Sequence, residues 1–166
     1  MNLITSPLKL AAILEVNAVN KVLETNEESQ YYGLVLTAKD ARELIETRCE
    51  ALRANGRIEI GSDTINKIIS TFCNSYYIWQ ANYTQTLHDL LETFYYMKNE
   101  TLDIISDDEL IKQMKFFFEN QCGGSIELLQ GRYLENFARQ IRYGITSHDQ
   151  LEEDFNNTDI EDGEDY

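Results

Sequence analysis

The turn Cys122-Gly123-Gly124-Ser125 is the local feature of the chain that we would examine first for a functional site. Adjacent glycines let backbone N–H groups converge, and a helix that begins at Ser125 would direct its positive end toward an anion. Together with Arg132 these groups could hold a phosphate or a carboxylate, and the helix dipole would lower the pKa of the Cys122 thiol. The same residues also suit a plain turn, in which glycine ends one helix and serine caps the next. We expect the plain turn and keep the anion site as the alternative.

An aromatic-rich connection between two predicted helices forms a second candidate site. It contains Tyr76, Tyr77, Trp79 and Tyr83. Tyrosine and tryptophan are favoured at the centres of protein–protein interfaces, so these residues are candidates for contact with another protein. The same side chains could instead close one end of a helical core, which is the interpretation that we favour for this segment.

The two histidines and three cysteines offer little for catalysis or metal binding. His88 would lie one helical turn from Glu92, a spacing that suits a metal-ligand or acid–base pair, but we favour a hydrogen bond on the helix surface because the helix has no second histidine. A zinc site built from Cys73, His88 and Cys122 would match no short-loop zinc pattern, and Cys49 and Cys73 fall on apolar helical stripes. We therefore expect no metal and no cofactor.

Sequence signatures of the common enzyme classes are missing from the chain. It has no phosphate-binding Gly-x-x-x-x-Gly-Lys loop, no dinucleotide fingerprint, no paired helical histidines and no nucleophile elbow. Their absence lowers the expectation of an enzyme. The alternative that stays open is a small enzyme or ligand-binding protein that uses Cys122, Ser125, His88 or the arginines Arg48, Arg53 and Arg57.

Six segments with helical spacing of apolar residues would position these side chains. Their starts are marked by capping signals at Ser6-Pro7, Thr37, Ser106 and Ser125, and glycines mark several of the ends. The last segment contains Gly131, which could kink or split it. The predicted helices cover approximately residues 6–25, 37–55, 62–73, 87–95, 106–123 and 125–144.

The sequence thus predicts an all-α fold, a compact bundle of about six helices that occupies residues 1–147 as one domain. Two short segments, Leu34-Val35-Leu36 and Ile58-Glu59-Ile60, alternate or are β-branched enough to pair as a minor two-stranded ribbon. Residues 148–166 are rich in acids and have no apolar face to bury, which predicts a disordered acidic C-terminal tail.

The net charge of −15 argues against nucleic acid and membranes as direct partners. An acidic surface repels phosphate backbones and anionic headgroups. The longest uncharged stretch, residues 68–87, contains too many polar side chains to span a bilayer. Three widely spaced cysteines fit reduced thiols better than a disulfide framework, so we expect a soluble, cytoplasmic protein.

Five short strings in the chain are distinctive: Glu46-Thr47-Arg48, Arg53-Ala54-Asn55-Gly56-Arg57, Phe94-Tyr95-Tyr96-Met97-Lys98-Asn99-Glu100, Ser106-Asp107-Asp108-Glu109-Leu110 and Cys122-Gly123-Gly124-Ser125. They resemble an uncharacterised family, catalogued as a domain of unknown function, of Gram-positive bacterial proteins of roughly this length. The resemblance covers about residues 8–142, omits the acidic tail and implies a bacterial cytoplasmic setting, without transferring an activity, a cofactor or a catalytic residue.

These observations predict a non-catalytic protein-interaction or scaffolding module. Its partner would be another protein, and its contact surface would be formed by helices and by the aromatic connection. The geometry of the candidate residues decides between this function and the enzyme alternative, because a catalytic site needs its polar groups to converge in a concave, partly apolar pocket.

Overall fold

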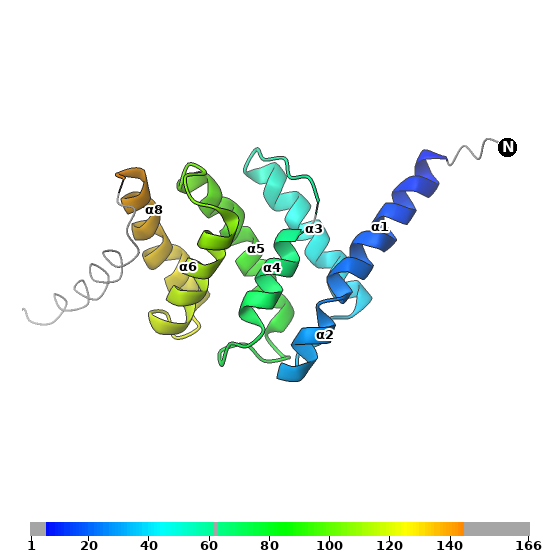
Figure 1. The fold of residues 1–166 in the computed structure, drawn as a ribbon, viewed down its shortest axis with the longest axis horizontal. Coiled ribbons are helices and arrows are strands. Elements are labelled where there is room, and N and C mark those ends of the chain that lie inside the picture. Colours follow the sequence, from blue (N-terminus) through cyan, green and yellow to red (C-terminus); the bar gives the residue numbers. More distant parts are fainter. Residues whose placement is uncertain (1–5, 62, 145–166) are drawn as a thin grey trace, which may run out of the picture.

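The computed structural model describes residues 6–61 and 63–144, and these form helices and turns without a strand (Figure 1). The prediction of an all-α fold is confirmed. The predicted acidic tail, residues 148–166, lies outside the described residues. The elements are α1 (Pro7–Leu23), α2 (Asn26–Ser29), the 3₁₀ turn η1 (Gln30–Tyr32), α3 (Ala38–Ala54), α4 (Asp63–Phe72), α5 (Tyr83–Glu100), α6 (Asp107–Asn120), α7 (Ile126–Leu128), the π-helical turn η2 (Leu129–Tyr133) and α8 (Leu134–Arg142).

The helices begin where the capping residues predict. The Ser6 hydroxyl accepts a hydrogen bond from the backbone N–H of Lys9, and Ser106 caps α6 in the same way. Thr37 and Asp40 form a reciprocal capping box at the start of α3. Because each cap satisfies a backbone donor that the helix itself cannot pair, the sequence determines these starting points locally.

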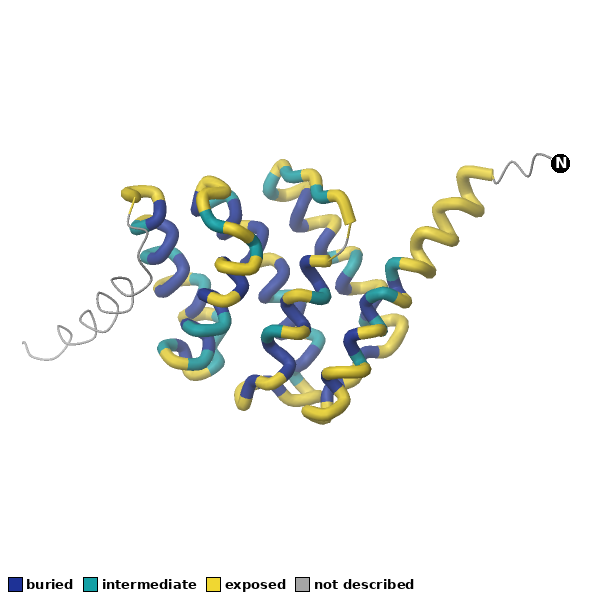
Figure 2. The backbone as a smooth tube through the Cα atoms, viewed as in Figure 1, coloured by how far each residue is buried: buried dark blue, intermediate teal, exposed yellow. Residues whose placement is uncertain are grey.

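Helix α5 is the centre of the bundle. It packs against α3, α4, α6, α7 and α8 and buries ten of its residues. Buried positions therefore concentrate in the middle of the molecule, whereas the first part of α1 is exposed along its whole circumference (Figure 2). Edge-to-face ring contacts, such as Phe72 with Phe118 and Phe117 with Phe137, fill the space between the surrounding helices.

The last predicted helix is split, as the position of Gly131 suggested. Gly131 lies inside the π-helical turn η2, which separates α7 from α8. Glycine lowers the cost of leaving regular α-helical geometry. The wider turn places both Leu129 and Tyr133 in the core, while Gln130 donates a hydrogen bond to the hydroxyl of Thr93 on α5.

The predicted ribbon between residues 34–36 and 58–60 is wrong. The two segments flank α3, and each is held by side-chain hydrogen bonds rather than by the other segment. The backbone of the first segment is already paired: both polar groups of Val35 bond to the Gln80 side chain, and both of Leu36 bond to the Asn26 side chain. Alternation of residue types was a local signal that could not include these contacts.

A buried polar cluster holds the second segment instead. The Glu59 carboxylate accepts hydrogen bonds from Arg48 Nε at 3.0 Å, from Thr64 Oγ1 at 3.1 Å and from the Tyr95 hydroxyl at 2.9 Å. Arg48, 8% exposed, also donates to the carbonyl oxygen of Gly61. Burial raises the pKa of Tyr95, so its hydroxyl stays protonated and donates to Glu59. The charges are thus paired inside the bundle, where an unpaired charge would be costly.

A second polar cluster joins the same loop to the connection between α5 and α6. Arg57 donates two parallel hydrogen bonds, of 2.9 and 2.7 Å, to Asp103 and a third, of 2.8 Å, to Asn99. The hydrogen bonds from Arg57 hold the pKa of Asp103 below its ordinary value. Lys98, buried nearby, donates to the carbonyl oxygen of Ile105 and pairs with Asp107. Two of the strings that carry the family resemblance, Arg53–Arg57 and Phe94–Glu100, therefore help to hold the loop after α3 against the connection between α5 and α6.

We expect Glu59→Ala to destabilise the protein by about 2–3 kcal/mol, because it leaves the buried guanidinium of Arg48 without its carboxylate. The matched control is Glu43→Ala, which removes an exposed ion pair with Lys39 and should change stability by less than about 0.5 kcal/mol. Urea unfolding of the parent and both variants measures the difference. Equal losses for the two variants would contradict a stabilising role for the buried pair.

Asp103 should make a pH-dependent contribution to stability. Its pKa is lower in the folded chain than the ordinary 3.8, so its contribution is present above that value and is lost as the pH falls through the folded pKa. Since the Asp103 side chain is half exposed, we expect Asp103→Asn to lower the free energy of unfolding by at most about 1 kcal/mol at neutral pH. This difference from the parent should vanish in strongly acid solution. Unfolding curves at both pH values test this, and a cost that persists in acid would contradict it.

Candidate functional site

The aromatic connection, residues 73–82, lies at the end of the bundle where α4 finishes and α5 begins (Figure 1). Tyr76 is 99% exposed, and Tyr77 and Trp79 also reach the surface. Tyr83 does not, because it is the first residue of α5 and is 1% exposed. Burial raises the pKa of Tyr83 to about 12. Three of the four predicted contact residues are therefore available to a partner, and the fourth belongs to the core.

The connection is held in one shape by its own polar groups. The side-chain amide of Asn82 accepts a hydrogen bond from the Trp79 N–H at 2.9 Å and donates to the carbonyl oxygen of Tyr77 at 3.1 Å. The Ser75 hydroxyl accepts from the Tyr77 N–H at 3.3 Å. The three exposed rings therefore project from a backbone that is locally fixed.

A second aromatic segment, residues 30–35, lies beside this connection. The Gln80 side-chain amide bonds to the N–H and carbonyl of Val35, at 2.9 and 3.0 Å, across 45 positions of sequence. Tyr31, Tyr32 and Val35 are exposed there, and sequence reasoning missed them. The only available signal was the repeated Tyr-Tyr pair. We call the combined surface the aromatic end face, consisting of Tyr31, Tyr32, Val35, Tyr76, Tyr77 and Trp79.

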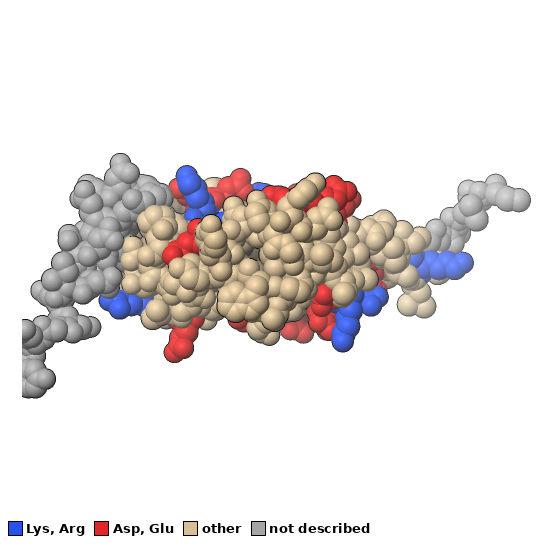
Figure 3. Space-filling view, turned by 90° about the horizontal axis from the view of Figure 1, so that it is seen from below, with Lys and Arg blue, Asp and Glu red and all other residues tan. Residues whose placement is uncertain are grey.

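Charged side chains are scarce on this end of the molecule. Figure 3 views the bundle from the end that carries residues 73–82, and its central area shows neither acidic nor basic groups, which lie mainly along the edges. Residues 73–82 contain no charged side chain. In a chain with a net charge of −15, a broad uncharged surface with exposed rings stands apart from the rest.

The Cys122–Ser125 segment is a turn between α6 and α7. Gly123 and Gly124 adopt φ angles of +56° and +82°, and Ser125 caps α7, which is only three residues long. Cys122 is buried, and burial raises the pKa of its thiol to about 11, opposite to the direction expected for an activated cysteine. Arg132 lies over the ring of Tyr133, 5.5 Å from its centroid.

The turn and the aromatic connection meet at Gly124. A Cβ atom at Gly124 would lie 2.5 Å from the Cβ of Tyr77, so only glycine lets the two segments pack this closely. The Tyr77 ring also makes an edge-to-face contact with Phe118, at 6.0 Å between centroids. The two candidate sites read from the sequence are therefore neighbours, and the turn positions one ring of the aromatic end face.

Three of the other candidate residues, His88, Arg48 and Arg57, are engaged in structural contacts. The Nδ1 atom of His88 lies 2.6 Å from the hydroxyl of Thr47, which joins α5 to α3. Arg48 and Arg57 belong to the two polar clusters, and Arg53 is exposed. Cys49, predicted on an apolar stripe, is exposed because the buried face of α3 is centred on Leu44 and Arg48. Among the described residues, no three His, Cys, Asp or Glu side chains are grouped as a metal site would need.

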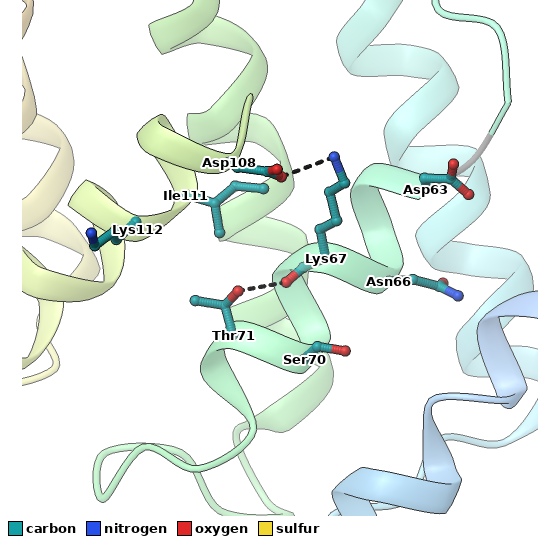
Figure 4. Close-up of a pocket in the computed structure, with 8 residues that line it drawn as sticks. All are labelled: Asp63, Asn66, Lys67, Ser70, Thr71, Asp108, Ile111 and Lys112. Atoms are coloured by element: carbon teal, nitrogen blue, oxygen red, sulfur yellow. Dashed lines mark hydrogen bonds and ion pairs between the residues drawn. The ribbon is translucent and has the colours of Figure 1, made fainter. Parts of the chain in front are cut away.

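A hollow of about 590 Å³ lies between α4 and α6 (Figure 4). Lys67 reaches across it to Asp108, at 2.9 Å, while Asp63 at its edge pairs with Lys21. The hollow contains none of the residues that sequence reasoning singled out. The ion pair between Lys67 and Asp108 ties α4 to α6.

A second hollow, of about 740 Å³, separates α5 from the π-helical turn. Its lining includes the four acids Asp89, Glu92, Glu127 and Glu135. The Tyr96 hydroxyl donates a hydrogen bond to Glu135 at 3.3 Å, and the charge of Glu135 raises the pKa of Tyr96. This concentration of negative charge opposes the binding of an anionic substrate.

Replacing Gly124 by alanine tests how the aromatic end face is built. The added Cβ would displace Tyr77, and the alanine backbone would have to keep a positive φ. We therefore expect the free energy of unfolding to fall by about 2–4 kcal/mol. Gly123→Ala is the matched control, since it meets only open space and should cost about 1 kcal/mol. Thermal and urea unfolding measure both. Equal losses of unfolding free energy at the two positions would show that the packing of Tyr77 does not depend on Gly124.

Comparison with known proteins identifies a family without identifying an activity. No curated protein and no solved structure matches the chain. A family model matches residues 21–147, which include α2 to α8, both polar clusters and the aromatic end face, and exclude most of α1. Its description states only that the function is unknown. The chain therefore belongs to this family of unknown function, DUF6323.

Proposed function

We propose that the protein is a non-catalytic interaction module that binds a partner protein through the aromatic end face. The observation that supports this proposal is the group of exposed tyrosine and tryptophan rings on an uncharged surface, held by a fixed backbone. Such rings bury a large area and lose little conformational entropy on binding, because they have only two side-chain torsions. They therefore suit the centre of an interface.

The chemistry of the surface indicates the kind of partner. An uncharged aromatic centre fits an apolar patch that also offers hydrogen-bonding groups to the tyrosine hydroxyls. Glu27 and Glu28 are exposed on α2, just before Tyr31, so a basic margin on the partner would match them. A polyanion such as nucleic acid is disfavoured by the net charge of −15.

The alternative of a small enzyme or anion-binding protein at the Cys122–Ser125 turn has less support. The Cys122 thiol is buried with a raised pKa, and Gly124 serves the packing of Tyr77. Arg48 and Arg57 are paired with carboxylates, and His88 is paired with a hydroxyl. A nucleophile, a base and an anion-binding group would have to converge for catalysis, whereas these residues serve separate contacts.

The proposed setting is the bacterial cytoplasm. The three free thiols fit a reducing compartment, and the strings that carry the family resemblance point to bacteria. Among the described residues, no helix is long and apolar enough to cross a membrane.

The test begins by recovering partners from the native cells with the parent chain and measuring the affinity of each recovered protein by calorimetry. We expect Trp79→Ala and Tyr76→Ala each to weaken binding at least about tenfold, as truncation of an interface anchor does. Tyr143→Ala, an exposed tyrosine beyond the end of α8, is the matched control and should bind like the parent. Parent-like affinity of both end-face variants would refute the proposal.

A further inference from the structure

The loop after α3 carries two isoleucines that are almost fully exposed. Ile58 is 97% exposed and Ile60 is 100% exposed, whereas Glu59 between them directs its carboxylate into the buried polar cluster. This alternation of outward and inward side chains is that of a β-strand. The loop lies at the end of the bundle opposite residues 73–82 (Figure 1), so it is separate from the aromatic end face.

One edge of this segment is paired with its own bundle. The carbonyl oxygens of Glu59 and Gly61 both accept hydrogen bonds from the Nη2 atom of Arg48, and the backbone bends at residues 60 and 61. In a strand, the backbone groups of alternate residues point to the same edge. The inner edge of residues 57–61 therefore faces Arg48, a buried guanidinium that the Glu59 carboxylate also binds.

The opposite edge is open. It consists of the N–H and carbonyl groups of Ile58 and Ile60, none of which bonds to another of the described residues. Folded proteins usually shorten, charge or cover a strand edge, because unpaired backbone groups beside apolar side chains attract another strand. Here the side chains at the open edge are isoleucines, which strands favour, and the described part of the chain contains no strand that could pair with them.

A strained turn adds apolar surface at this end of the bundle. Leu102 follows α5 with a φ of +55°, in the hydrogen-bond pattern that usually ends a helix at glycine. Its side chain is 62% exposed, and Ile104 is 54% exposed, so neither gains much from packing within the chain. Asp103 lies between them and accepts two hydrogen bonds from Arg57, the residue before Ile58. The four aliphatic side chains therefore belong to one end of the molecule.

We propose that residues 57–60 bind an extended segment of a partner protein by strand addition, through main-chain hydrogen bonds to Ile58 and Ile60. The partner segment carries β-branched or aromatic side chains at alternate positions, opposite the two isoleucines. The net charge of −15 favours lysine or arginine beside these apolar residues. The proposal does not depend on the proposed function, because a partner held at the aromatic end face leaves this edge free.

A second copy of the same segment is the poorer occupant. Antiparallel pairing of two such edges places the Glu59 residues of the two copies directly opposite each other, with both side chains on one face. Each of these carboxylates lies inside its own bundle. The two bundles would then have to occupy the same side of strands that are only about 5 Å apart. An extended segment of a different protein meets no such obstacle.

The probe for this edge is a short peptide in which valine and threonine alternate between terminal lysines, blocked at both ends. Nuclear magnetic resonance of the full chain should show a dissociation constant of about 1 mM or lower. We expect slower amide exchange at Ile58 and Ile60 and no change in residues 73–82. An absence of binding at several times that concentration, or changes only outside residues 57–60, would overturn the proposal.

Methylation of the peptide backbone tests the pairing itself. The valine N–H groups lie on the edge that pairs with Ile58 and Ile60, whereas the threonine N–H groups lie on the other edge. We therefore expect the peptide that is N-methylated on its valines to lose binding and the peptide that is N-methylated on its threonines to retain it. Equal binding of the two methylated peptides would refute strand addition.

Ile60→Pro makes the same test on the protein. Proline lacks the N–H group at the open edge and tolerates an extended residue before it, so we expect peptide binding to weaken at least about tenfold while urea unfolding stays unchanged. Ile60→Val is the matched control and should bind like the parent, because it keeps the N–H group and a β-branched side chain. Parent-like binding by Ile60→Pro would contradict the proposal. A parent dimer in sedimentation equilibrium that Ile60→Pro abolishes would assign the edge to a second copy instead and refute the separate partner.

Discussion

The rest of the structure depends on the burial of α5. This helix is enclosed by five other elements, so its two ends determine where the connections at each end of the bundle can run. At its first turn, Tyr83 enters the core and fixes the end of the aromatic connection. Toward its last turns, Tyr95 and Lys98 place polar groups inside the bundle, and Glu59 and Asp107 pair with them. The core and the connections at both ends of the bundle are therefore parts of one packing arrangement.

One close approach links that arrangement to the proposed interaction surface. Tyr77 packs against Gly124, where no side chain larger than hydrogen fits, and the same ring contacts Phe118 in the core. The residue types of the Cys122–Ser125 turn suggested an anion site. In the structure the turn contributes to packing, because Gly124 has no side chain that would displace Tyr77. The resulting surface is rigid, aromatic and uncharged, and these three properties together favour protein recognition.

The sequence predicted those features whose causes are local. Capping pairs such as Thr37 with Asp40 located helix starts, and Gly131 marked the break before α8. The sequence could not predict contacts between residues that are far apart along the chain. The hydrogen bonds between Gln80 and Val35, which join residues 30–35 to the aromatic connection, span 45 residues. The thiol of Cys122 had its pKa raised by burial in the core rather than lowered by a helix end, and burial depends on packing that short patterns do not encode.

Hydrogen exchange of the chain with and without its recovered partner protein tests the central claim most directly, because it maps the contact without altering a residue. We expect slower amide exchange on binding in both segments of the aromatic end face, residues 30–35 and 73–82, and little change in the loop that carries Ile58 and Ile60. Protection confined to the hollow between α4 and α6, or to the acidic hollow beside η2, would contradict it.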